Sequence, residues 1–177
     1  MMAVSQELRA GGTIYLGFSA GGLAALTASN LDPATRAYFG LDMVDHRGLG
    51  KLTAPQLTIP LYGLLADPSP CNAGNNALDV YASASRPFLL KIADATHCHF
   101  EWPMDWKCAI VCGRGEKQYS RQEIQRAILG LTTAFLLWQT GIDPSAATWW
   151  SVDSHNFKTM AEAGYIIPIE LMPIGNN

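Results

Sequence analysis

The chain has 177 residues, of which 49% are hydrophobic and 15% are charged, with a formal net charge of −3. That length predicts one domain over residues 1–177 with enough apolar residues for a core. The acidic balance and the lack of any basic block exclude a typical nucleic-acid binder, which needs a lysine- and arginine-rich face for phosphates. No apolar run reaches the roughly 18 residues of a membrane span, and the N-terminal sequence has no signal-peptide pattern.

Four short runs of apolar, β-branched and aromatic residues stand out along the chain. Each is nearly continuous in apolar residues, which predicts a strand buried on both faces. The runs are Thr13–Phe18, Arg36–Leu41, Leu57–Leu65 and Pro87–Ala93. Small residues after Ser19 predict a helix that ends before Asn30. Residues Asn72–Ser85 show a weaker helical pattern, and Tyr165–Leu171 predicts a short strand.

The strongest helical pattern covers Gln122–Thr140, where apolar residues recur at spacings of three, four and seven. Ser120 and Glu123 have the spacing of a capping box at its start. Gly141 stands at the position where a helix commonly ends. Strands that alternate with helices predict an α/β fold with a parallel sheet and flanking helices. In such sheets function gathers at the carboxyl ends of the strands.

One motif carries chemistry at such a strand end. Gly17-Phe18-Ser19-Ala20-Gly21 reads G-x-S-x-G between a predicted strand and a predicted helix, which is the context that a nucleophile elbow requires. The two glycines should let strand and helix pass closely, and the Ala20 N–H would face a developing oxyanion. We therefore predict that Ser19 is a nucleophile.

A serine hydroxyl needs a base, and His97 directly follows the last strand of the predicted set. The other histidines (His46, His99 and His155) follow no strand end as directly. A third residue must orient the imidazole, and three aspartates compete for that role. Asp42 and Asp45 follow the second strand, and Asp67 follows the third. Topology alone slightly favours Asp67.

With these residues in place, the chain resembles the α/β-hydrolase superfamily, and within it bacterial esterases that are similar to chlorophyllases and platelet-activating-factor acetylhydrolases. The matching stretches are GFSAGG, GLDMVD, ADPSPCNAGNN and ATHCHFEWPMDWKCAIVCG, within about Gly12–Gly141. In those families the first Asp of the second stretch is the acid, so the resemblance implies Asp42 with Asp67 as the alternative. Chlorophyllases have Arg where this chain has Ala20, so the resemblance does not extend to chlorophyll as the substrate.

The resemblance also implies strands ahead of the nucleophile that this sequence does not contain. The superfamily places its nucleophile after the fifth of about eight strands, whereas Ser19 follows the first predicted strand. We therefore expect an α/β-hydrolase-type sheet that lacks the N-terminal strands, in a partial domain. A missing N-terminal half or an oligomer partner would then complete the chain.

The expected function is hydrolysis of a small-molecule carboxylic ester by Ser19, His97 and Asp42, through an acyl-enzyme and without a metal or organic cofactor. The aromatic segment after His97, around Phe100, Trp102, Met104 and Trp106, would line an acyl pocket or serve only for packing. One alternative is a non-catalytic or complement-requiring α/β-hydrolase fragment. Another is a zinc-binding module, whose ligands would come from His97, Cys98, His99, Cys108 and Cys112.

Four cysteines (Cys71, Cys98, Cys108 and Cys112) cluster in one window of the chain. An even, clustered set predicts two disulfides and favours a secreted or periplasmic location. Reduced, buried thiols are the other reading. The pairing stays open, because four cysteines allow three connectivities. A helix over Cys108 and Cys112 would place both on one face.

Overall fold

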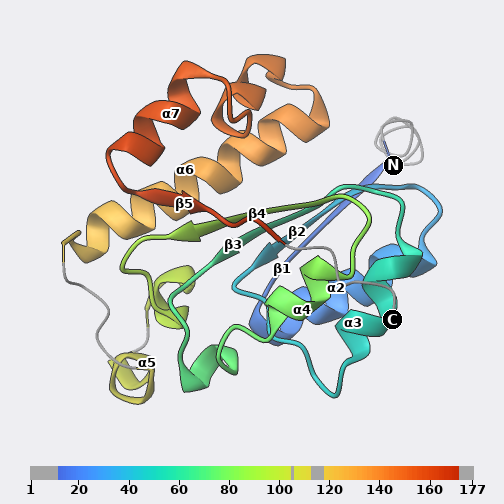
Figure 1. Cartoon of the computed structure of the whole chain (residues 1–177), viewed down its shortest axis with the longest axis horizontal. Helices are drawn as coiled ribbons and strands as arrows, with labels where there is room; N and C mark the ends of the chain where they lie inside the picture. Colours follow the sequence, from blue (N-terminus) through green and yellow to red (C-terminus); the bar gives the residue numbers. More distant parts are fainter. Residues whose placement is uncertain (1–11, 105, 113–117, 172–177) are drawn as a thin grey trace, which may run out of the picture.

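The computed structural model describes residues 12–104, 106–112 and 118–171. These residues form a five-stranded sheet with helices on both faces (Figure 1). The strands are β1 (Thr13–Phe18), β2 (Thr35–Leu41), β3 (Leu61–Leu65), β4 (Pro87–Ile92) and β5 (Ile166–Pro168). Their spatial order follows the chain order. The first four strands are parallel and β5 is antiparallel to β4, so the α/β class is confirmed but the sheet is mixed rather than wholly parallel.

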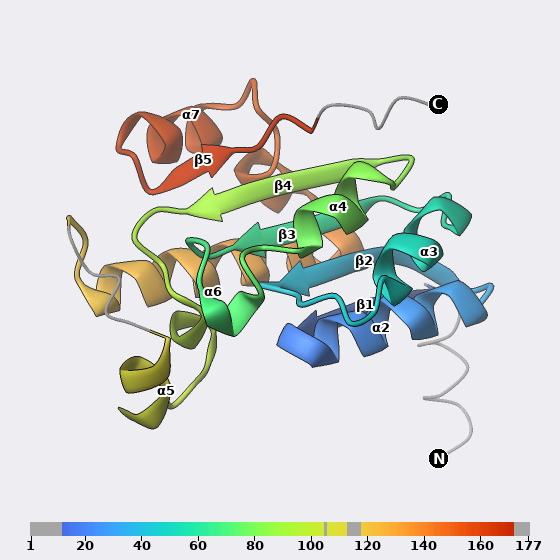
Figure 2. The ribbon, with the colours of Figure 1, turned by 60° about the horizontal axis from the view of Figure 1, so that its bottom comes forward.

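Helices cover the two faces of the sheet in unequal groups. One face packs against α6 (Arg121–Thr140) and α7 (His155–Glu162). The other packs against α2 (Ser19–Leu31), α3 (Leu49–Thr53) and α4 (Ala77–Ala82), as Figures 1 and 2 show from two directions. A further short helix, α5 (Trp106–Val111), lies beyond the carboxyl ends of the strands in both views. In the part of the chain that the structure describes, no helix is long and apolar enough to cross a membrane.

Two predicted strands differ from the observed ones in a way that local chemistry explains. The predicted run Leu57–Leu65 becomes a strand only from Leu61, because Pro60 has no N–H for a ladder and residues 57–60 form no regular element. Strand β1 lies at an edge of the described sheet and is only partly buried, with Leu16 exposed. The prediction that all four runs are buried on both faces is therefore wrong for β1.

Helix α6 matches its predicted boundaries within one residue. The Ser120 hydroxyl accepts from the Glu123 N–H, and the Glu123 carboxylate accepts from the Ser120 N–H at 2.8 Å, which confirms the capping box. Gly141 ends the helix with a φ of 75°. The weaker prediction over Asn72–Ser85 shortens to α4, and the predicted strand Tyr165–Leu171 shortens to β5.

The core has two parts, one on each face of the sheet. Under α6 and α7 it is aromatic: Phe39 stacks on Phe135 with ring centroids 4.6 Å apart, and Trp150 packs edge-on against Phe39. Under α2, α3 and α4 it holds Tyr38 and Tyr81 at full burial. Because the sheet is held between two packed layers, the carboxyl ends of β1, β2, β3 and β4 are fixed along one edge.

Candidate active site

Ser19 sits at a sharp turn between β1 and α2. It is the first residue of the helix, yet its φ is +53°, a left-handed value that L residues seldom adopt. Gly17 makes the turn sterically feasible, because a Cβ at this position would collide with the Gly21 carbonyl group. The strand-to-helix context that the G-x-S-x-G motif predicted is therefore present.

The second glycine of the motif has a different role from the one predicted. A Cβ on Gly21 would meet no atom within 4 Å, so Gly21 is not the residue that lets the helix approach the sheet. That role belongs to Gly22, where a Cβ would lie 2.9 Å from the Met43 Cβ and 3.0 Å from the Gly17 carbonyl oxygen. The buried Tyr38 hydroxyl, which belongs to β2, donates to the Gly22 carbonyl at 3.0 Å and so supports the same turn from the sheet.

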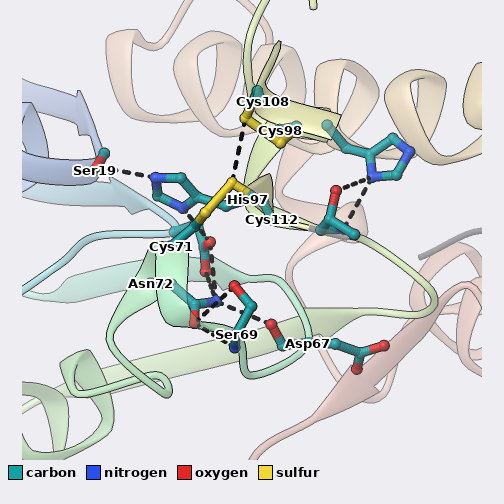
Figure 3. The surroundings of a disulfide bond; sticks show 12 residues. Ser19, Asp67, Ser69, Cys71, Asn72, His97, Cys98, Cys108 and Cys112 are labelled. Carbon is teal, nitrogen blue, oxygen red and sulfur yellow. Dashed lines mark hydrogen bonds and ion pairs between the residues drawn. A yellow bond between two sulfur atoms is a disulfide. The ribbon is translucent and has the colours of Figure 1, made fainter. Parts of the chain in front are cut away.

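The structure brings Ser19, His97 and Asp42 together at the carboxyl edge of the sheet. His97 lies in the 3-10 helix η3 (His97–Phe100), and its Nε2 is 2.9 Å from the Ser19 Oγ. Its Nδ1 is 2.6 Å from the Asp42 Oδ2. The Asp42 side chain is fully buried, His97 is nearly so, and Ser19 is partly exposed. Figure 3 shows the serine and imidazole facing each other.

The surroundings of the imidazole define its hydrogen-bond directions. A carboxylate only accepts hydrogen bonds, so His97 Nδ1–H donates to Asp42. Nε2 is then left as the acceptor for the Ser19 hydroxyl. The Phe18 ring packs against the imidazole at a centroid distance of 4.6 Å and stacks on Phe100. The imidazole can therefore take a proton from the serine while its ring is held by the hydrogen bond to Asp42 and by the packed Phe18 ring.

Of the three competing aspartates, only Asp42 contacts His97. Asp67 forms an ion pair with Lys91 instead, with 3.0 Å between its Oδ1 and the lysine Nζ. The Asp45 carboxylate accepts from the Gly50 N–H at 2.7 Å. Asp67, which topology alone slightly favours, therefore does not contact the imidazole. Asp42, the acid that the resemblance implies, does.

The buried Asp42 carboxylate has further donors that the sequence analysis did not identify. The Ala66 N–H donates to its Oδ1 at 2.9 Å, and the Asn72 amide donates to its Oδ2 at 3.2 Å. Asp42 itself has a left-handed φ of 40°. The sequence analysis included Asn72 in the stretch ADPSPCNAGNN, where it directly follows Cys71. The direction of its side chain, however, could not be predicted from the sequence.

The four cysteines form two disulfides, Cys71–Cys112 and Cys98–Cys108, which confirms the predicted bonds and selects one of the three connectivities. Cys108 and Cys112 lie one turn apart, as predicted, with their sulfurs 3.5 Å apart, although each pairs elsewhere. Zinc requires deprotonated thiolates, and none of the four cysteines is free in this structure. The sulfurs of Cys98, Cys108 and Cys112 lie within 4.8 Å of one another, close enough to hold a metal ion if the disulfides were reduced. His97 is engaged by Asp42 and Ser19.

A cavity of about 550 Å³ lies between the segment after His97 and helix α6. Phe100, Trp102, Leu41 and Ile128 are among its lining residues. It adjoins the site through Leu41, which precedes Asp42, and through Phe100. Trp102 and Trp106 of the predicted aromatic segment are both mostly exposed, and only Trp102 of the two lines this cavity.

No protein-family model matches the chain, and no curated protein is significantly similar to it in sequence. From its fold, the chain is therefore assigned to the α/β class, with a mostly parallel five-stranded sheet.

Proposed function

We propose that the chain is a serine hydrolase of the α/β-hydrolase type that acts on carboxylic esters. The observation that carries this proposal is the continuous line of contacts from Ser19 Oγ through His97 to Asp42, at the carboxyl edge of a parallel sheet. A serine with a neighbouring imidazole and a buried carboxylate is the arrangement that activates a hydroxyl for nucleophilic attack. The elbow motif and its left-handed serine support the same reading.

In the proposed reaction, Ser19 Oγ attacks the ester carbonyl carbon while His97 Nε2 takes the hydroxyl proton. The ester C–O bond then breaks, and His97 returns that proton to the leaving alcohol. Water attacks the acyl-enzyme with His97 again as the base, the acid is released, and Ser19 regains its proton. Asp42 holds the imidazole in the correct tautomer and offsets its transient positive charge.

The negative charge on the carbonyl oxygen needs a donor in the transition state. Ala20 is the second residue of α2, and the first N–H groups of a helix have no intrahelical acceptor. The positive end of the helix dipole favours an anion at the same place. We assign the Ala20 N–H as the oxyanion donor that this chain supplies.

A serine-directed fluorophosphonate tests the proposal, with the intact mass as the readout. We expect a single adduct that is absent in Ser19→Ala. Asp42→Asn should slow labelling by about 10³–10⁴-fold, since the imidazole then loses its orienting carboxylate. The matched variant Asp67→Asn should stay within about twofold, because that side chain pairs with Lys91.

The outcomes separate the readings of the sequence. No adduct on the folded wild-type chain would contradict hydrolase activity of this chain. It would favour a non-catalytic or complement-requiring fragment. Equal losses in Asp42→Asn and Asp67→Asn would contradict the assignment of the acid.

A further inference from the structure

Asn72 is the most completely engaged polar side chain beside the proposed site. It is fully buried at the end of the 3-10 helix η2 (Pro70–Asn72). Its Oδ1 accepts from the Ser69 N–H at 2.8 Å and from the Asn75 N–H at 3.2 Å. Backbone N–H groups can only donate, so these two contacts fix which end of the amide is the oxygen. The NH₂ group must therefore face the other way.

On that other side the amide has two acceptors. It donates to the Asp67 carbonyl oxygen at 3.0 Å and to the Asp42 Oδ2 at 3.2 Å. Two N–H bonds and two acceptors leave the amide with no alternative orientation. Together with the Ala66 N–H on Oδ1, the amide holds the Asp42 carboxylate from two directions. The same Oδ2 also accepts from His97 Nδ1–H at 2.6 Å.

The turn that carries Asn72 is itself fixed to the turn that carries His97. Cys71, the neighbour of Asn72, is bonded to Cys112, and Cys98, the neighbour of His97, is bonded to Cys108. Cys108 lies in α5 and Cys112 directly follows it, so one short helix fastens both turns (Figure 3). The position of Asn72 relative to the imidazole is therefore set covalently on one side and by hydrogen bonds on the other.

We propose that Asn72 is a positioning residue that orients the Asp42 carboxylate toward His97. The inference rests on the proposed function for its catalytic meaning. The orientation of the imidazole, however, can be measured whether or not the chain turns over an ester. A carboxylate without this donor could rotate, and a misplacement of about 1 Å near a reacting centre can cost about a hundredfold in rate.

The chain offers a matched control at Asn76. This residue has the same side chain, four positions further on, and fastens the same loop after β2: its amide bonds the N–H and carbonyl of Asp45 at 2.9 and 2.8 Å. It does not touch Asp42 in the structure. Asn72→Ala should lose more thermal stability than Asn76→Ala, because Asn72 is fully buried and leaves more partners without a hydrogen bond. Only Asn72→Ala should disturb the imidazole.

The first readout is the Nδ1–H proton of His97 in NMR spectra of histidine-labelled protein, assigned by its loss in His97→Gln. A strong hydrogen bond to Asp42 shifts this proton downfield. We expect the resonance to persist in Asn76→Ala and to be lost or moved upfield in Asn72→Ala. In parallel, fluorophosphonate labelling should slow about ten- to hundredfold in Asn72→Ala and stay within about twofold in Asn76→Ala.

The second readout is the pH profile of Asn72→Asp, which keeps the shape of the side chain. Two adjacent carboxyl groups retain one shared proton to a higher pH than a lone one, because repulsion disfavours double ionisation. While that proton stays, it can bond Asp42 as the amide does. Labelling of this variant should then fall at higher pH, whereas wild-type labelling should show no such fall. Tyr81 also interacts with Asp42, but burial raises its pKa well above the ordinary value, so it stays neutral throughout.

An unchanged Nδ1–H resonance in Asn72→Ala would overturn the proposal. So would a pH profile of Asn72→Asp with the wild-type shape at lower amplitude, which indicates a purely structural role. A wild-type chain that shows the resonance but no labelling would overturn the proposed function and leave the resonance to decide the role of Asn72. If Asn72→Ala does not fold, the pH profile of Asn72→Asp decides the role of Asn72 by itself.

Discussion

At the scale of single residues, the site concentrates unusual backbone geometry. Ser19 and Asp42 both have left-handed φ values, 53° and 40°. For residues with a Cβ this conformation costs about 1–2 kcal/mol each. Both are held in it by surrounding contacts, such as the Asp42 N–H donating to the Leu64 carbonyl at 2.7 Å and the Val44 N–H donating to the Ser19 carbonyl at 3.3 Å. This left-handed backbone conformation directs the Ser19 and Asp42 side chains toward the imidazole.

The elbow predicts opposite effects for its two motif glycines. Gly17→Ala should lower the free energy of unfolding by about 3 kcal/mol, because the new methyl group would collide with the backbone of α2. Gly21→Ala should leave it unchanged or raise it by up to about 1 kcal/mol, because alanine is the better helix former and its methyl group meets open space. Urea denaturation followed by tryptophan fluorescence measures both.

Equal destabilisation in the two variants would contradict this description of the turn. Gly22→Ala should also lower the free energy of unfolding, because its methyl group would lie 2.9 Å from the Met43 Cβ and 3.0 Å from the Gly17 carbonyl oxygen, neither of which can move away easily.

The residues of the site could be predicted from the sequence to different extents. Ser19 and His97 were predictable because each directly follows a strand, and parallel strands end at a common edge. Asp42 and Asp67 were not separable on that argument, because both follow strands equally well. What separates them is a tertiary contact: Lys91 neutralises Asp67, while Asn72 and Ala66 hold Asp42 against the imidazole. Asn72 lies in a turn without periodicity, so no pattern indicates its direction.

At the scale of elements, the sequence predicts the boundaries of α6 well and the start of β3 poorly. Helix α6 has a capping box, an apolar stripe and a terminal glycine, and all three local signals agree with its observed boundaries. The predicted strand starts too early because apolar residues before Pro60 continue the pattern, whereas residues 57–60 form no regular element and β3 begins at Leu61. The antiparallel direction of β5 depends on how α7 packs, which no local signal encodes.

The capping box makes α6 sensitive to acid. Hydrogen bonds from the Ser120 hydroxyl and N–H lower the pKa of the Glu123 carboxyl. Folding therefore favours its ionised form, so the stabilisation is complete above the unfolded-state pKa of about 4.3 and is lost as pH falls through the lower native value. Glu123→Gln should lower the thermal midpoint at neutral pH, and its difference from wild type should vanish in acid.

A suitable control is Glu162→Gln at the end of α7, where the same charge is removed away from any helix start. A constant difference between Glu123→Gln and wild type at all pH values would show that the carboxylate charge contributes nothing to the cap.

At the scale of the whole molecule, the two disulfides close loops of different lengths. Cys71 and Cys112 are 41 residues apart, and Cys98 and Cys108 are 10 apart within that loop. If chain entropy dominates, replacing the outer pair by serine should cost about 4 kcal/mol and replacing the inner pair about 3 kcal/mol. Urea denaturation of the two double variants tests this order.

The reverse order would mean that native contacts around α5, rather than the unfolded chain, determine the contribution of each bond. Fluorophosphonate labelling of the same variants would then show which of the two fastened turns matters more for Ser19.

The strand order of the sheet also has a consequence for synthesis on the ribosome. Because β1 to β5 lie side by side in the order in which they are translated, each new strand meets a partner that has already emerged. Ser19 and His97 are 78 residues apart in the sequence. At ordinary translation rates, on the order of ten seconds therefore separate the appearance of the serine from that of its base. A nascent chain therefore carries Ser19 for some time before His97, the base proposed for it, has been translated.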